Sequence, residues 1–223
     1  MRCVCWPSIP KRRPEMISPF GWSAIAVLLL YLALFFWGGA MAARAAGRSI
    51  WLFGQATGRD WLAAVGFRAA FALAALGPLV WLALSPLRSV DPLWTGQGSI
   101  FVSFAGHLLA ILGAMIAFAT QMAMGASWRV GVDPAAAGSL VSGGLYEISR
   151  NPTFAGQLML LVGVALALPS LPAVIAVFLF WLSANAQIRS EEHVLETALG
   201  APYLTYRAQV PRWIGRPGSI GKA

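Results

Sequence analysis

The stretch FAGQLMLLVGVALALPSLPAVIAVFLFWLSANAQI, residues Phe154–Ile188, is a long apolar run that is broken by LPSLP at 168–172. Two prolines three residues apart do not fit inside one α-helix, because each removes a backbone donor and clashes with the preceding turn. The run therefore predicts two helices, about Phe154–Leu168 and Leu171–Leu195, that form an antiparallel hairpin. The first is somewhat short for a membrane crossing, whereas the second is long enough to project beyond the bilayer.

Three further apolar segments precede this hairpin, at Ile17–Met41, Trp61–Leu84 and Ile100–Met124. Each is near or above the roughly 20 residues that a helix needs to cross a bilayer. Hydrophobic residues make up 58% of the 223-residue chain and charged residues 11%, against about 25% charged residues in a soluble domain. We therefore expect an all-α integral membrane protein with about five transmembrane helices, since the runs are too long for barrel strands.

The formal net charge is +8, and the positions of the arginines predict how the chain lies in the membrane. Four of them follow the first apolar segment: Arg44, Arg48, Arg59 and Arg68. The positive-inside rule places their loop in the cytoplasm, and with it residues 125–151 and the C-terminus. Lys11, Arg12 and Arg13 oppose this placement unless the chain starts at Met16. We expect a multi-pass protein of the bacterial inner membrane whose partners are membrane lipids, not nucleic acid.

Four regions follow from this layout. Residues 1–16 and 214–223 are predicted to be disordered tails, 17–126 to form three transmembrane helices, and 127–213 to form a ligand-binding region that includes the hairpin. Cys3 and Cys5 are the only cysteines, and they provide neither a disulfide framework nor a metal site.

Polar residues gather at the predicted cytoplasmic ends of the hairpin, in GGLYEISRNPTFAG (143–156) and RSEEH (189–193). Because the hairpin brings its outer ends together, Arg150–Pro152 and Arg189–His193 should be neighbours and form two walls of a pocket. Pro152 fits the first turn of a helix, whose amide groups favour a carboxylate or phosphate. Arg150 adds a planar donor. Glu191 and Glu192 suit an ammonium or ribose hydroxyls, so both S-adenosylmethionine and a dinucleotide fit this chemistry.

The two segments together strongly resemble the superfamily of isoprenylcysteine carboxyl methyltransferases and phospholipid methyltransferases, over about residues 127–213. The family pattern is G-x-Y-x-x-x-R-H-P-x-Y-x-G, a hydrophobic stretch, then E-E-x-x-L, F-G-x-x-Y-x-x-Y and V-P. The matching positions are Gly144, Tyr146, Arg150, Pro152, Gly156, Glu191, Glu192, Leu195, Gly200, Tyr203, Tyr206, Val210 and Pro211. Asn151 stands at the family histidine, Phe154 at the second tyrosine and Leu199 at the phenylalanine.

The resemblance implies S-adenosylmethionine-dependent methyl transfer at the cytoplasmic face, to a lipophilic acceptor such as a prenylcysteine carboxylate, a lipid amine or a thiol. Arg150, Asn151 and Pro152 would hold the carboxylate of the cofactor, and Glu191 with Glu192 its ammonium or ribose. Its adenine would lie among Tyr146, Phe154 and Tyr203. Gly144 and Gly156 complete the expected cofactor site. Arg150 and Arg207 are the expected catalytic residues, Arg207 by orienting an anionic acceptor whose tail lies between the third span and the hairpin.

Two other classes stay open. Membrane reductases of the sterol and steroid type have a similar C-terminal stretch and use NADPH, although Thr153 and Gln157 depart from their pattern. The substitution of Asn151 for histidine also fits a non-catalytic membrane protein with the same fold. Inside the third span, His107 is a candidate functional group, and Gln121 is expected to form a hydrogen bond between helices.

Overall fold

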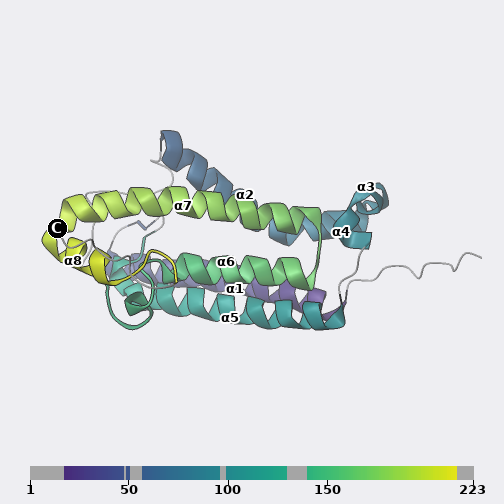
Figure 1. Cartoon of the computed structure of the whole chain (residues 1–223), viewed down its shortest axis with the longest axis horizontal. Coiled ribbons are helices and arrows are strands. Elements are labelled where there is room, and N and C mark those ends of the chain that lie inside the picture. The colour runs from purple at the N-terminus through teal and green to yellow at the C-terminus, as the bar shows by residue number, and fades with distance from the viewer. Residues whose placement is uncertain (1–17, 48, 51–56, 96–98, 130–139, 215–223) are drawn as a thin grey trace, which may run out of the picture.

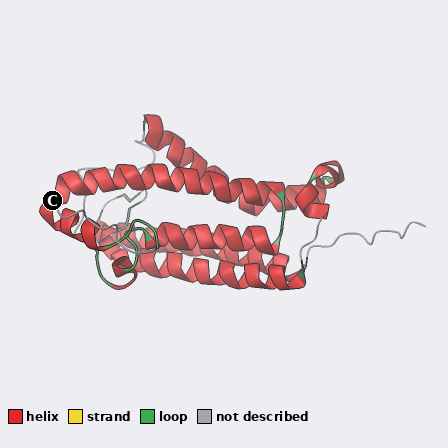
Figure 2. Cartoon of the chain, in the orientation of Figure 1, coloured by secondary structure: helices red, strands yellow, loops and turns green. Residues whose placement is uncertain are grey.

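The computed structural model describes residues 18–47, 49–50, 57–95, 99–129 and 140–214, and every regular element within them is helical (Figure 2). Four helices are long and apolar enough to cross a membrane: α1 (Pro19–Ala46), α2 (Gly58–Ala83), α5 (Ile100–Met124, continued by η2, Gly125–Ser127) and α7 (Leu171–Leu199). The all-α membrane fold is therefore confirmed. The two tails predicted to be disordered lie outside the described residues, except for Ile214.

The remaining elements are short. They are α3 (Ser85–Val90), α4 (Pro92–Thr95), η4 (Gly144–Glu147), α6 (Pro152–Ala167) and α8 (Ala201–Gln209). Helix α6 is apolar but only 16 residues long, or about 24 Å, against about 30 Å for the hydrocarbon core. The described residues thus hold four span-length helices and one shorter apolar helix, which is the hairpin arm that the sequence predicts to be short for a crossing.

Serine and proline residues set where several helices begin. The hydroxyl groups of Ser18, Ser99 and Ser170 accept hydrogen bonds from the first turns of α1, α5 and α7. Pro152 and Pro172 occupy the first turns of α6 and α7, where a missing backbone donor costs nothing. The break at LPSLP is the one that the sequence predicts.

Glycine residues bring α5 and α6 into close contact along their length. A Cβ atom on Gly113 would lie 2.4 Å from the backbone nitrogen of Leu160, and one on Gly156 would lie 2.6 Å from that of Ala117. Gly106 and Gly163 make the same kind of contact further along. This seam lets two helix backbones approach as small residues do in membrane proteins, and Figure 1 shows α6 running beside α5 and α1.

The second arm of the hairpin packs on a different helix. Helix α7 lies mainly against α2, where a Cβ atom on Gly66 would meet the hydroxyl of Ser183. The two arms run antiparallel, as predicted, and their rings meet at Phe154 and Phe180, with centroids 6.4 Å apart. Each arm nevertheless packs more extensively on its other neighbour, because the glycine seam holds α6 to α5 (Figure 1).

Asp91 joins three helices at the end of the molecule where α7 begins. Its carboxylate is fully buried. It accepts hydrogen bonds from the indole of Trp81 at 2.8 Å and from the backbone nitrogens of Leu93 (2.9 Å), Trp94 (3.3 Å) and Leu171 (2.8 Å). The sequence patterns do not predict α3, α4 or this junction.

Candidate functional site

A cavity lies at the opposite end, where α1, α5 and α7 end and α6 begins. The empty space inside it, including open solvent at its mouth, is about 960 Å³. One wall is aromatic and apolar, with Phe35 from α1, Phe67 from α2 and Phe154 from α6. The other wall carries polar side chains from η4, α6, α7 and α8: Tyr146, Arg150, Asn151, Thr153, Gln157, Gln187, Glu191, Glu192, Tyr203 and Tyr206.

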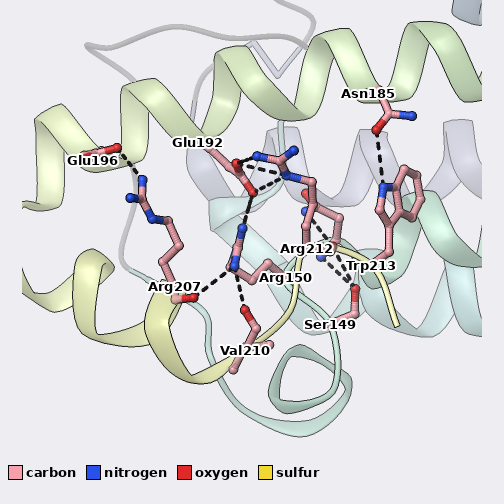
Figure 3. Close-up of polar contacts among 10 residues, drawn as sticks. Ser149, Arg150, Asn185, Glu192, Glu196, Arg207, Val210, Arg212 and Trp213 are labelled. Atoms are coloured by element: carbon pink, nitrogen blue, oxygen red, sulfur yellow. Dashed lines mark hydrogen bonds and ion pairs between the residues drawn. The ribbon is translucent and has the colours of Figure 1, made fainter. Parts of the chain in front are cut away.

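Arg150 and Glu192 meet across the outer ends of the hairpin, which confirms the predicted proximity of the two polar segments. The Nη2 atom of Arg150 lies 2.7 Å from Oε1 of Glu192, and both side chains are only 10% exposed. Figure 3 shows the two side chains reaching toward each other from opposite elements.

Arg212 is a third member of this cluster, and the sequence analysis did not identify it. Its Nε and Nη2 atoms donate to both carboxylate oxygens of Glu192 at 2.5 to 3.2 Å (Figure 3). These hydrogen bonds raise the pKa of the Arg212 guanidinium above its usual value. Two guanidinium groups around one carboxylate leave the cluster with a net positive charge. Glu192 is thus already paired on both oxygens within the protein.

The backbone of Val210–Trp213, here called the C-terminal strap, closes over Ser149–Asn151. Arg150 donates from Nη1 to the carbonyls of Val210 (2.6 Å) and Arg207 (3.1 Å), and its backbone nitrogen donates to Pro211. The amide of Asn151 donates to the carbonyl of Arg212 at 3.0 Å. Arg150, expected to hold a ligand carboxylate, therefore has four hydrogen bonds to protein acceptors, and its main contacts fasten the strap.

Three other expected site residues do not line the cavity. Gly156 lies in the α5–α6 seam, where its lack of a side chain serves helix packing. Gly144 is the first residue of η4 and adopts φ of +64°, a conformation that favours glycine. Pro152 is buried in the first turn of α6. These three motif residues therefore shape the backbone around the cavity and do not line it.

Arg207 also lies outside the cavity lining. It forms an ion pair with Glu196 at 2.7 Å in which both side chains are more than 40% exposed (Figure 3). The expectation that Arg207 orients an acceptor is not supported by this position. The glycine seam leaves no space for an acceptor tail between α5 and α6 at these glycines, and the expected path between the third span and the hairpin stays a prediction.

Tyrosine hydroxyl groups form part of the polar wall and make hydrogen bonds within the protein. Tyr206 donates to the carbonyl of Tyr146 at 2.7 Å, and the hydroxyl of Tyr146 lies 3.4 Å from Thr153 Oγ1. Burial raises the pKa values of Tyr146 and Tyr203 to about 12. Both phenols are therefore neutral hydrogen-bond donors at physiological pH and do not serve as bases.

Two buried glutamines, deeper along α6 and α7, were not predicted as site residues. Gln157 donates from Nε2 to the hydroxyl of Tyr31 at 2.6 Å, and Gln187 donates to Glu191 Oε1 at 3.0 Å. Their Oε1 atoms, like the indole nitrogen of Trp128, are buried and have no hydrogen-bond partner among the described residues. The spacing of Gln187 and Glu191, four residues apart on one helix face, is a signal that the sequence does contain.

His107 and Gln121, the two residues of the third span that the sequence marks as candidates, have structural contacts. Gln121 donates to the carbonyl of Phe35 at 2.9 Å, which confirms the expected bond between helices. His107 Nδ1 lies 3.0 Å from Ser23 Oγ on α1, toward the end of the bundle opposite the cavity. His107 is thus separate from this site.

The comparison with protein families gives one match: residues 101–201 match the phospholipid methyltransferase family. The search of curated proteins finds no match. The matched segment begins in α5, contains η4, α6 and α7, and ends at the start of α8, so it includes most of the polar wall of the cavity. Over these residues the chain is similar to the phospholipid methyltransferase family, part of the superfamily of membrane methyltransferases that the sequence motifs resemble.

Proposed function

We propose that this protein transfers a methyl group from S-adenosylmethionine to a lipophilic acceptor in the membrane. The observation that carries the proposal is the cavity itself. It joins the polar ends of the hairpin to an apolar aromatic wall, within the segment that matches a methyltransferase family. A ligand with both a polar end and a reactive group facing the bilayer suits these two walls.

The residues around the cavity mouth fit the chemistry of this cofactor. The positive cluster of Arg150, Glu192 and Arg212 favours a carboxylate, and Asn151 leaves the first turn of α6 without a side-chain cap. The backbone amides of that turn are then available to an anion. Tyr203 and Phe154 offer faces for adenine, and the buried indole N–H of Trp128 is a donor without a partner among the described residues.

Bound in this way, the cofactor supplies a sulfonium methyl group with a neutral leaving group. The protein then mainly has to align donor and acceptor, because alignment alone lowers such a barrier by several kcal/mol. Phe35, Phe67 and Phe154 would hold the acceptor against the methyl group and exclude water. The active site would face the cytoplasm, in keeping with the arginines at this end of the bundle.

Thermal unfolding of the detergent-solubilised protein tests this function. S-adenosylmethionine and S-adenosylhomocysteine should each raise the melting temperature. At a ligand concentration of 100 Kd, the free energy of unfolding should rise by about 2.7 kcal/mol. Tyr203→Ala should weaken the effect, whereas Thr205→Ala, on the exposed side of α8, should not. A shift with NADPH alone would place the protein among the reductases, and no shift with any of the three would contradict the proposal.

A further inference from the structure

Two residues that line the cavity, Trp128 and Gln187, each bury a polar atom that has no hydrogen-bond partner among the described residues. The atoms are the indole nitrogen of Trp128, a donor, and the amide oxygen of Gln187, an acceptor. The two residues are only 7% and 5% exposed. Because a buried polar atom left unpaired costs free energy, a ligand that pairs with both atoms would be stabilised at this place.

Their neighbours place Trp128 and Gln187 on the same side of the cavity. Gln187 donates from Nε2 to Oε1 of Glu191, at 3.0 Å and one turn further along α7. Arg129 follows Trp128 directly in the sequence and interacts electrostatically with the same Glu191. The chain at Trp128 and Arg129 therefore lies near this turn of α7, and the unpaired donor and the unpaired acceptor belong to one part of the cavity wall.

Both groups are positioned before any ligand binds. The indole of Trp128 meets the ring of Phe35 edge to face, with centroids 6.1 Å apart and an angle of 85° between the planes, and it belongs to the buried core. The amide nitrogen of Gln187 faces Glu191, which leaves the amide oxygen as its unpaired atom. A ligand that binds here therefore has little side-chain entropy to remove.

The two ends of S-adenosylmethionine differ in chemistry, and this difference decides which end suits Trp128 and Gln187. The positive cluster of Arg150, Glu192 and Arg212 suits the amino-acid end, which carries the carboxylate. Gln187 lies five residues before Glu192 on α7, or about 7.5 Å along the helix axis. At that distance from the cluster the ligand presents its adenosine. Adenine is flat, and at its edge an amino group that donates stands beside ring nitrogens that accept.

We infer that Trp128 and Gln187 recognise the edge of the adenine. The indole N–H of Trp128 donates to a ring nitrogen beside the amino group, and the amide oxygen of Gln187 accepts a hydrogen from that amino group. The faces of the ring would lie against Phe154 and Tyr203, which line the same cavity. This inference rests on the proposed function, and it assigns base recognition to two residues that are not positions of the sequence motif.

The test measures the Kd of the full-length protein in detergent for S-adenosylhomocysteine and for three analogues that differ at the edge of the base. In the first, hypoxanthine replaces adenine, so that a carbonyl oxygen stands in place of the amino group. In the other two, carbon replaces one of the two ring nitrogens on either side of that group. We expect the hypoxanthine analogue and one of the two carbon analogues to bind the wild type about 10-fold more weakly, the effect of losing one buried hydrogen bond.

Two substitutions assign the contacts. Trp128→Phe keeps an aromatic ring and removes the N–H donor, so it should bind S-adenosylhomocysteine about 10-fold more weakly and no longer discriminate against the carbon analogue. Gln187→Leu should no longer discriminate against the hypoxanthine analogue. The controls are Trp37→Phe, on the exposed face of α1, and Gln157→Leu, whose amide oxygen also lines the cavity unpaired among the described residues. Both controls should keep the two preferences of the wild type.

Each preference is a ratio of two affinities measured on one variant, so a general loss of stability does not imitate it. Equal affinity of the wild type for all four ligands would overturn the inference and leave the proposed function intact. The same holds if Trp128→Phe and Gln187→Leu weaken all four ligands by a common factor, or if the preferences disappear in Gln157→Leu instead. No binding of S-adenosylhomocysteine or its analogues to the wild type would contradict the proposed function, and the inference would fall with it.

Discussion

At the scale of single residues, Glu192 illustrates how a motif residue can serve the framework of a site. It forms ion pairs with both Arg150 and Arg212, which reach it from two different segments. Removing one partner of a buried ion pair is costly because the remaining charge stays desolvated. We therefore expect Glu192→Ala to lower the stability of the folded protein by about 3 kcal/mol.

The measurement is the melting temperature in detergent, without ligand. Glu196→Ala is the matched control, because Glu196 forms an exposed pair with Arg207, and such a pair contributes less than about 1 kcal/mol. Equal losses in the two variants would contradict the assignment of Glu192 to a buried clamp.

Asn151 leads to a second prediction at this scale. Its side-chain amide donates to the carbonyl of Arg212, and a histidine at this position also carries a donor. We expect Asn151→Ala to destabilise the strap by about 1 kcal/mol, whereas Asn151→His keeps the hydrogen bond. The rate of limited proteolysis after residue 209 measures how firmly the strap is held against the rest of the protein. Faster cleavage of Asn151→His than of Asn151→Ala would contradict this interpretation.

At the scale of elements, the α5–α6 seam makes the sharpest prediction. The Cβ atom of an alanine at Gly113 would lie 2.4 Å from the backbone of Leu160, so the two helices have to separate. We expect Gly113→Ala to cost about 1 to 3 kcal/mol. Gly143→Ala is the control, because nothing lies within 4 Å of a Cβ atom there. Equal melting temperatures for the two variants would show that the helices are not in close contact.

Asp91 makes a separate prediction at the other end of the bundle. Asp91→Ala leaves three backbone nitrogens and one indole without their acceptor, and we expect a loss of about 3 kcal/mol. Ser89→Ala, on the exposed face of α3, should have little effect. Because the junction is far from the cavity, folded Asp91→Ala should still bind S-adenosylhomocysteine with the affinity of the wild type.

The sequence predicts the helices well and the contacts between them less well. The bounds of α5 agree with the predicted segment Ile100–Met124, and the hairpin break falls at its two prolines, because long apolar runs and proline act locally. Arg212 and Asp91 were missed, since their roles depend on partners from distant segments. Gln187 was missed although its partner Glu191 lies only one turn away. Gly156 was given a ligand-binding role, whereas it packs on α5, because a motif records position and not the neighbour in space.

At the scale of the whole molecule, the charge distribution predicts orientation. The cavity end carries most of the described arginines, including Arg44, Arg59, Arg129 and Arg189, and Arg88 lies at the other end. The positive-inside rule therefore predicts that the cavity faces the cytoplasm. In a background with Cys3 and Cys5 replaced by serine, Ser89→Cys should react with a membrane-impermeant thiol reagent on intact cells. Thr205→Cys should react only after permeabilisation, and the reverse result would invert the topology.

The C-terminal strap also bears on how the protein is made. Residues 210–213 follow α1, α2, α5, α6 and α7 in the sequence, and chains fold from the N-terminus during synthesis. The ribosome therefore delivers the strap only after these helices have been translated. Arg150 and Glu192 meet their last partner, Arg212, at that moment. A nascent chain that stops before residue 210 would carry the membrane helices without the strap that covers Ser149–Asn151.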